Sequence, residues 1–462
     1  MSSTFPQGDT PGFCALTTVL PECFSSSLLS AIFSAVSGEI AKGGLLTDRI
    51  GIGVLTRLVP RDTVDEVLAE TGRREKRSRL LPAHVVVYFV LALAVFHDGY
   101  EEVMRRLVGG LQFMGTWRRE WSVPTTGAIS QARERLGEAP LKALFDRIAE
   151  PLAVPGTPGA WLGSRRLMAI DGVKLDVPDT PANIEGFGRP EGVTRRPFPQ
   201  IQVIGLAECG THAVVAAEIG TVSVGERELA GKLAPCLEPG MLVIADRGFY
   251  SFQLWAEFMT TGADLLFRIA SGVRLPAREI LPDGSYLSEI SSRKVRGSGY
   301  RIPLAVVGDP REATHIPVRV VEYTVTGSAA GREPEVFRLI TTVLDPEELT
   351  APEIAAAYHE RWEYEIALKE IETQMLEPGS GLRSRSPDLV RQELWGLLLA
   401  HYAIRALMTE AAGAAGLDPD RLSFIRSINV VRRLVTDQAA FSPRETGDSC
   451  EDEHRRDPGK SH

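Results

Sequence analysis

Residues 357–375 read AYHERWEYEIALKEIETQM, and this stretch decides the fold. It contains no Gly or Pro and consists mostly of good helix formers, so it predicts a helix. On a helical wheel of about 100° per residue, five apolar or aromatic side chains fall within one narrow arc. These predicted core residues are Ala357, Tyr364, Leu368, Ile371 and Met375.

A second arc of the same helix carries polar and charged side chains. It contains Tyr358, Arg361, Glu365, Lys369 and Glu372, so a ring hydroxyl, two cations and two carboxylates share one stripe. One interpretation is a solvated helix face with i,i+4 ion pairs, such as Glu365 with Lys369. The other is a functional face, and the stretch alone does not separate the two.

Two aspartates follow apolar runs that read as buried strands. The run LMAI leads into Asp171 and Gly172 within a strand expected at 167–177, and the run MLVIA leads into Asp246. An Asp close to a Gly is often a turn former, so each aspartate alone has a purely structural interpretation. A pair of carboxylates at the ends of buried strands is less expected by chance, because an unpaired buried charge is costly.

Together with Glu365, these aspartates form a set of three carboxylates. Hard divalent cations such as Mg²⁺ prefer oxygen ligands and are often held by few carboxylates. Two such ions about 4 Å apart can activate a nucleophile and stabilise a leaving oxygen in phosphoryl transfer. The sequence therefore predicts that Asp171, Asp246 and Glu365 bind two metal ions and are the catalytic residues.

Strand and helix patterns alternate around these residues, which predicts an α/β core. Further strands are expected at 201–206, 213–219 and 264–269, helices at 226–237 and 252–261, and a loop at 183–199. Short β runs at 304–307, 318–325 and 337–343 indicate a β-rich insertion at residues 271–346.

Helical patterns precede and follow the core. Residues 1–150 are expected to form a helical N-terminal domain, with helices at 25–41, 60–70, 81–96 and 130–150. Residues 117–136 have a helix, turn, helix pattern compatible with DNA binding, and a plain helical bundle is the alternative. Helices at 389–412 and 422–435 predict a C-terminal helical region at 381–440, and the polar residues 441–462 predict a disordered tail.

The charge of the chain does not by itself point to a nucleic-acid partner. The 462 residues carry a formal charge of −9, which counts against such a partner, although whole-chain charge can hide a basic face. Arginines suited to phosphate contact do cluster, and ordinary surface arginine is the alternative for any single pair. The clusters include Arg73 and Arg74, Arg105 and Arg106, Arg118 and Arg119, Arg165 and Arg166, and Arg195 and Arg196.

The cysteines and the apolar runs indicate a cytoplasmic protein. Five cysteines are scattered without a C-x-x-C pair, which argues against a zinc site and a disulfide framework. Residues 1–35 lack a signal-peptide pattern, and the apolar run at 85–96 is too short to span a bilayer. No membrane partner is expected.

Three motifs give the chain a family resemblance. They are Ile170-Asp171-Gly172, Ala245-Asp246-Arg247-Gly248-Phe249-Tyr250 and Tyr358-x-x-Arg361-Trp362-x-x-Glu365. Two further segments agree, Leu382-Arg383-Ser384-Arg385-Ser386 and Arg391-Gln392-Glu393-Leu394. Over roughly residues 60–435 the chain resembles a DDE transposase of the insertion-sequence-four family.

The resemblance implies a ribonuclease-H-like catalytic core at residues 164–270 and 347–380, interrupted by the β-rich insertion. It implies Mg²⁺-dependent cleavage, with Mn²⁺ as a substitute ion, at the terminal inverted repeats of a transposon in double-stranded DNA. Cut-and-paste insertion into target DNA would follow, carried out at the nucleoid by a homodimer on paired ends. Tyr358, Arg361 and Lys369 are then expected to bind DNA beside the metals, and the N-terminal domain and the 389–412 helix are candidate dimer interfaces.

The sequence departs from the family pattern in two places. The family motif has a lysine seven residues after the glutamate, and here that position is Glu372, with Lys369 nearby on the same stripe. Hairpin-forming relatives use a tryptophan in the insertion, and residues 271–346 contain none. Two alternatives therefore stay open: a decayed or repurposed transposase that binds ends without cutting, and a structure-selective nuclease on the same core.

Overall fold

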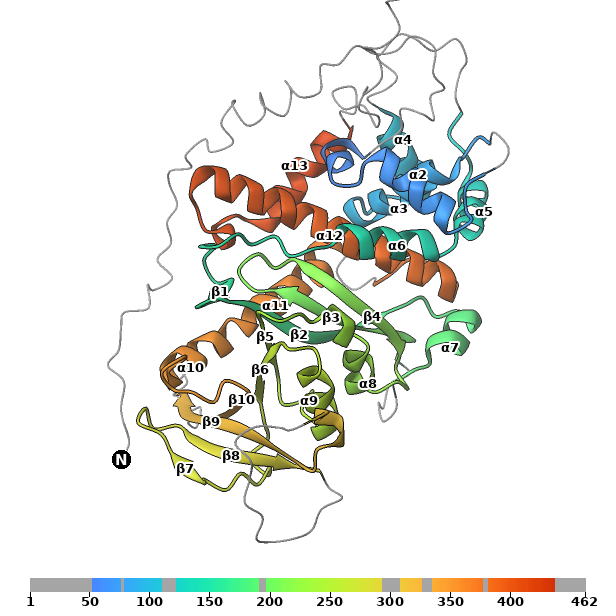
Figure 1. Ribbon diagram of the computed structural model, residues 1–462. Helices are drawn as coiled ribbons and strands as arrows, with labels where there is room; N and C mark the ends of the chain where they lie inside the picture. The colour runs from blue at the N-terminus through green and yellow to red at the C-terminus, as the bar shows by residue number, and fades with distance from the viewer. Residues whose placement is uncertain are drawn as a thin grey trace, which may run out of the picture. The chain divides into compact units, whose positions relative to one another are not determined.

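The computed structural model describes residues 52–75, 79–109, 122–190, 197–292, 308–325, 335–376 and 381–436 (Figure 1). The helix expected at 25–41, the strand expected at 304–307 and the tail at 441–462 lie outside the described residues. So does the first part of the helix, turn, helix pattern, residues 117–121.

One mixed sheet of ten strands runs through the described chain. Its order is β4-β3-β2-β5-β6-β10-β9-β8-β7, with β1 paired to β2. Strands β2, β5 and β6 pair in parallel, while β3, β4 and β7–β10 join the sheet through antiparallel pairs. The strands are β1 (Trp161–Leu162), β2 (Arg165–Asp176), β3 (Gln200–Glu208), β4 (Val214–Thr221), β5 (Met241–Ala245), β6 (Asp264–Arg268), β7 (Glu279–Ile280), β8 (Tyr286–Ser291), β9 (His315–Val325) and β10 (Glu335–Thr341).

The central strand β5 shows why the sequence forms this sheet. All five of its residues, MLVIA, are buried, as expected of a parallel strand with a neighbour on each side. Strand β10 pairs with β6, so the strands of the β-rich segment extend the core sheet and do not form a second one. The predicted fold class, an α/β core between N-terminal and C-terminal helices, is confirmed.

The helices lie before, between and after the strands. They are α2 (Arg61–Glu70), α3 (Ala83–Val95), α4 (Tyr100–Gly109), α5 (Thr126–Leu136), α6 (Ala139–Ile148), α7 (Pro181–Phe187), α8 (Glu226–Gly231), α9 (Phe252–Met259), α10 (Ala351–His359), α11 (Arg361–Glu370), α12 (Pro387–Ala415) and α13 (Phe424–Thr436). All 13 residues of α3 are buried, and this helix packs against α12 (Figure 1). The early helices and the last long helix therefore share one apolar core.

Helix α12 is consequently poorly placed as a dimer interface. Its buried residues include Leu394, Trp395, Leu398 and Ile404, which contact elements of the same chain. The candidate interface at 389–412 is therefore largely covered by α3 and α6 of the same chain, which leaves little of this helix for a second subunit.

One buried arginine links the early helices to the start of α12. The side chain of Arg133, which is fully buried in α5, donates from Nε to Gln392 Oε1 at 2.8 Å and from Nη2 to the Leu389 carbonyl at 3.0 Å. Arg383 similarly donates to the backbone carbonyl of Asp98 at 3.0 Å. Both family-like segments after residue 380 thus hold the helices together, and Arg133 points into the core instead of toward a DNA partner.

Several predicted elements differ from the observed ones. The helix expected at 130–150 is two helices, α5 and α6, because Gly137 between them adopts a φ of 70°. The loop expected at 183–199 begins with α7, whose first turn Thr180 caps by accepting from the Asn183 N–H. The helix expected at 226–237 is the shorter α8, followed by a 3₁₀ turn at Ala234–Cys236.

The helix expected at 357–375 is also interrupted. Helix α10 ends at His359, α11 begins at Arg361, and residues Ile371–Met375 form a π-helical turn. The predicted core face is nevertheless confirmed. Ala357, Tyr364, Leu368, Ile371 and Met375 are all buried, with exposed fractions of 1–9%.

Among the described residues, no single helix has the length and hydropathy to cross a membrane. Helices α3 and α4 meet both criteria only when taken together, as a pair bent by 107°.

Candidate active site

The two aspartates lie on neighbouring parallel strands. Strands β2 and β5 pair in parallel up to Ile170 and Ala245, so Asp171 and Asp246 follow at the same edge of the pairing. The strand expected at 167–177 is observed as β2, so Asp171 ends the apolar run and not the strand. Strand β2 continues to Asp176 because its antiparallel partner β3 is longer than β5. Asp171 thus lies where the parallel pairing ends.

Helix α11 brings Glu365 to these aspartates, and its neighbour Tyr364 sets how the helix sits. Tyr364 is buried over Gly205, which is the β3 residue paired with Asp171. A Cβ at position 205 would lie 2.1 Å from the Tyr364 hydroxyl oxygen, so only glycine leaves room for the ring. The close approach of ring and strand holds the helix against the sheet at Asp171.

Arg361 stands between two of the three carboxylates. Its guanidinium donates from Nη1 to Asp171 Oδ2 at 2.9 Å and from Nη2 to Glu365 Oε1 at 2.8 Å. The Arg361 side chain is only 9% exposed, compared with 21% for Asp171 and 27% for Glu365. An i,i+4 ion pair therefore exists on the stripe, but it joins Arg361 to Glu365, is partly buried within the site and does not lie on a solvated face.

Tyr358 makes the corresponding contact with the third carboxylate. Its hydroxyl donates to Asp246 Oδ1 at 3.1 Å, and the residue is 3% exposed. Burial and the charge of Asp246 raise the pKa of Tyr358, so the phenol keeps its proton. All three carboxylates are thus bound by the two donors of the Tyr358-x-x-Arg361 motif.

The electrostatics of the site favour a bound cation. Burial raises the pKa of Asp171, and the nearby negative charges of Glu365 and Asp246 add to this, while the Gly172 N–H and Arg361 act against it. Three neighbouring carboxylates, two of which share one guanidinium, offer hard oxygen ligands of the kind that suits Mg²⁺ or Mn²⁺. The donor set therefore fits a divalent metal.

The remaining residues of the polar stripe are exposed. Lys369 lies on the surface of α11, and Glu372 lies on the π-helical turn. The wheel angle expected for Glu372 in a regular α-helix does not apply after Glu370, because the hydrogen-bonding pattern changes there. Partial burial raises the pKa of Glu372, and the charge of Lys369 opposes that shift.

The described arginine clusters are largely neutralised inside the chain. Arg73 donates to the Arg135 carbonyl at 3.1 Å. Four others form ion pairs, Arg105 with Glu102, Arg106 with Asp98, Arg165 with Asp264 and Arg166 with Glu208. For these members, structural pairing is the better interpretation than phosphate contact.

A second polar cluster lies behind α11, and the sequence analysis missed it. His212, Glu363 and Asp420 bring their ligand atoms within 4.8 Å of one another, as no other set of His, Cys, Asp or Glu does among the described residues. The three positions are far apart in the sequence and follow no spacing rule, so only the fold reveals them.

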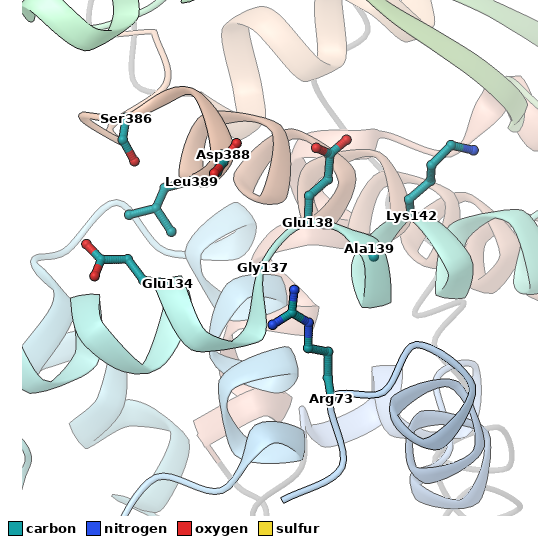
Figure 2. A pocket seen from close by; sticks show the side chains of 9 residues that line it. All are labelled: Arg73, Glu134, Gly137, Glu138, Ala139, Lys142, Ser386, Asp388 and Leu389. Carbon is teal, nitrogen blue, oxygen red and sulfur yellow. The ribbon is translucent and has the colours of Figure 1, made fainter.

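A cavity elsewhere in the structure contains none of the predicted site residues (Figure 2). It lies between α5, α6 and the start of α12, and its charged lining residues are of both signs. They are Arg73, Glu134, Glu138, Lys142 and Asp388.

Similarity to known proteins extends over nearly all of the described residues. The family model "Insertion element 4 transposase N-terminal" matches residues 49–146, and the model "Transposase DDE domain" matches residues 162–403. The chain is 30% identical over 384 residues to the transposase InsG for insertion sequence element IS4 of Escherichia coli (strain K12), which covers 83% of this chain and 82% of that protein. Its fold is also similar to a piggyBac transposase in a synaptic complex with hairpin DNA, at a TM-score of 0.46 and 11% identity, over 88% of this chain and 86% of that one.

Proposed function

Because the chain belongs to the insertion element 4 family of DDE transposases, whose chemistry is metal-dependent phosphoryl transfer on DNA, we propose that it moves its transposon by cut and paste. It would cut double-stranded DNA at the terminal inverted repeats and join the freed ends to a target. The observation that carries this proposal is the set of contacts in which Arg361 joins Asp171 to Glu365 while Tyr358 donates to Asp246.

Asp171, Asp246 and Glu365 are the residues that would hold the metal, and we propose two Mg²⁺ ions, with Mn²⁺ able to replace them. When bound, such ions activate a water or 3′-hydroxyl nucleophile and stabilise the leaving oxygen. The chain supplies the ligands from two parallel strands and one helix, so their spacing depends on how α11 is held against the sheet.

Arg361 and Tyr358 would then serve the DNA substrate. A guanidinium suits bidentate phosphate contact, and a phenol suits a single hydrogen bond. Both donors are bonded to carboxylates that the metal would also use, so metal binding would free them for phosphate oxygens. Lys369, exposed on the next turn of the same helix, would extend this contact.

The natural assembly for this reaction is a homodimer on two paired ends, because cut and paste needs both ends held together. Such a protein would work at the nucleoid, in the cytoplasm.

The test is substitution of each proposed ligand. Asp171→Ala, Asp246→Ala and Glu365→Ala should each abolish cleavage of an end-containing duplex while leaving end binding largely intact, since removing one ligand destroys the metal site and not the DNA-binding surface. The measurement is a gel assay of cutting, paired with a binding isotherm. Glu410→Ala, which breaks only an exposed pair with Arg57, is the matched control and should cut normally. Near-normal cutting by any of the three ligand variants would contradict the assignment.

An assay on the same DNA distinguishes this function from two further candidate functions. Glu372, a carboxylate where the family has a lysine, favours a protein that binds ends without cutting. A nuclease on the same core would cut without joining. A donor plasmid assay distinguishes the three, because it reports excision with integration, binding alone, or cleavage alone.

A further inference from the structure

Six charged or polar side chains form a network behind the catalytic helix. They are His212, Glu363, Glu370, His401, Arg405 and Asp420, named here the back network. Four of them, His212, Glu370, His401 and Arg405, are at most 4% exposed. The six side chains come from four places in the chain, namely the β3–β4 turn, α11, α12 and the 3₁₀ turn at Pro419–Arg421.

The back network holds α11 at two points. Near the start of the helix, His212 Nε2 contacts Glu363 and lies 3.0 Å from Asp420 Oδ1. At the last residue of the helix, Glu370 Oε2 accepts from Arg405 Nε at 2.9 Å and lies 3.0 Å from His401 Nε2. Arg405 joins the two points, since its Nη2 contacts both Glu370 and His212 Nδ1.

These two points lie on the side of α11 away from the carboxylates. Glu363 and Glu370 are seven residues apart, so at about 100° per residue they share one face. Glu365 is about 200° further round from Glu363 and therefore points the opposite way. Because the network contacts the back of the helix at both ends, it restricts movements of the helix that would displace Glu365.

The back network is not arranged as a metal site, despite the convergence of His212, Glu363 and Asp420. A metal-bound histidine normally donates its other ring N–H to a carboxylate or carbonyl. Here the other nitrogen, Nδ1, faces the guanidinium of Arg405, which can only donate. The ring must accept at Nδ1 and carry its proton on Nε2, where it serves Glu363 and Asp420.

Stability alone does not explain why these charges are buried. Buried ion networks are often replaceable by apolar side chains without loss, because desolvation offsets their attraction. His212 also adopts a φ of 58°, in the left-handed region that is costly for most residues other than Gly. A strained backbone and several desolvated charges are retained directly behind the residue that the chemistry needs.

We propose that the back network positions the catalytic helix: by fixing the rotation and height of α11, it sets the place of the Glu365 carboxylate opposite Asp171 and Asp246, and so sets how tightly the site binds divalent metal. This inference rests on the proposed function, because it takes Glu365 as a metal ligand. Residues that orient metal ligands from behind typically contribute 10–100-fold to metal affinity or activity.

The experiment measures Mn²⁺ binding to the full-length chain by electron paramagnetic resonance, beside end binding and thermal unfolding. Glu363→Gln, His212→Asn and Arg405→Met each remove contacts of the back network, and Asn suits the left-handed backbone at position 212. Each should weaken Mn²⁺ binding by about 10-fold or more at unchanged stoichiometry. End binding should stay within about 2-fold of the parent, since the network does not reach the DNA-facing stripe. Arg405→Lys keeps a cation beside Glu370 and should recover part of the lost affinity.

Glu410→Gln is the matched control on α12, because it changes a carboxylate that is 54% exposed and pairs only with Arg57. It should leave Mn²⁺ affinity unchanged. Should Glu363→Gln fail to fold, Asp420→Asn weakens the other carboxylate contact of His212 Nε2, and the same loss of Mn²⁺ affinity is expected.

Three outcomes would overturn the inference or its premise. If the network variants are less stable but bind Mn²⁺ as tightly as the parent per folded molecule, the network is only structural. If the chain carrying Glu365→Ala still binds one Mn²⁺ that Glu363→Gln removes, the network is itself a metal site and the inference is wrong. If Glu365→Ala changes neither Mn²⁺ binding nor cutting, the proposed function has failed, whatever the network variants show.

Discussion

Arg361 offsets the charge of the two carboxylates to which it donates, Asp171 and Glu365. The sequence predicted this residue on the polar stripe beside Glu365, and spacing alone could predict that i,i+4 pair. Spacing could not predict the bond to Asp171, which lies 190 positions away and depends on the docking of α11 against β2. Replacing Arg361 is therefore expected to change both the stability of the fold and the binding of DNA ends.

Arg361→Ala should lower the free energy of unfolding of the metal-free protein by about 3 kcal/mol, because it leaves partly buried carboxylates without their counter-charge. Divalent metal should restore much of this loss, so Mg²⁺ should raise the unfolding temperature more in the variant than in the parent. End binding should also weaken, with a shallower dependence on salt, if the guanidinium meets phosphate. Denaturant unfolding with and without Mg²⁺, and binding isotherms at several salt concentrations, measure both effects.

The matched control is Arg147→Ala, which removes an exposed arginine paired with Glu66 and Glu70. It should leave both unfolding and metal response close to the parent, as expected for surface pairs. An unchanged salt slope in Arg361→Ala would count against phosphate contact, and normal stability would count against the central role of its charge.

Lys369 and Glu372 carry opposite charges at the exposed end of the same stripe. We expect Lys369→Ala to lower end binding and cleavage more than Glu372→Ala, because a long ammonium side chain can reach a phosphate that the carboxylate repels. Glu372→Lys should tighten binding by about 1 kcal/mol in a partly screened groove. Binding isotherms of the three variants at two salt concentrations measure this, and three superimposed curves would exclude both residues from the DNA surface.

At the scale of the element, periodicity predicted which faces are buried better than it predicted where elements end. The core face of residues 357–375 is correct because burial follows the positions of apolar side chains, and these survive the break at Glu360 and the π-helical turn. The break itself has no Gly or Pro to announce it. By contrast, the strand expected at 167–177 agrees with β2 to within two residues at each end, and Asp171 ends only the apolar run inside it.

His401 on α12 makes the stability of the back network depend on pH. The side chain is fully buried among Glu370, Arg405 and His212 and stacks on Phe424, and this burial lowers its pKa. The unfolded chain takes up a proton at this residue as the pH falls below about 6.5, whereas the folded chain does so only at lower pH. Above a pH of about 6.5, neutral His401 contributes its full stability to the fold. This contribution is lost as the pH falls from there toward the pKa of His401 in the folded chain.

His401→Gln keeps a donor for Glu370 but does not titrate. Its free energy of unfolding should fall less steeply than that of the parent below pH 6.5, by at most about 1.4 kcal/mol per pH unit. Denaturant unfolding from pH 7.5 to 5 measures the difference, and parallel curves for the two proteins would show that His401 titrates normally in the fold.

At the scale of the molecule, the sequence predicted the α/β core and the flanking helices, because alternation of patterns and apolar content are properties of whole segments. It did not predict that β7–β10 would continue the core sheet through β6. Nor did it predict that Arg133 and Arg383 join the early helices to the late ones, since these hydrogen bonds connect residues more than 250 positions apart.

We expect the whole protein to act in an assembly on two paired DNA ends. Cleavage should occur in a complex containing two chains of 50.4 kDa and two DNA ends, as seen by mass measurement during turnover. Because α12 is buried in its own chain, substitutions on its apolar face should unfold the protein instead of releasing a folded monomer. Cutting by a complex of one chain on one end would contradict the dimer.

The complete burial of α3 also concerns how the protein is made. Its 13 apolar-rich residues leave the ribosome about 290 residues before α12, the helix that covers them. At 5–20 residues per second, the nascent chain exposes this helix for on the order of 15–60 s before its partner is synthesised. A chaperone is therefore expected to hold the growing chain, and messages truncated before residue 387 should yield products that aggregate or are degraded.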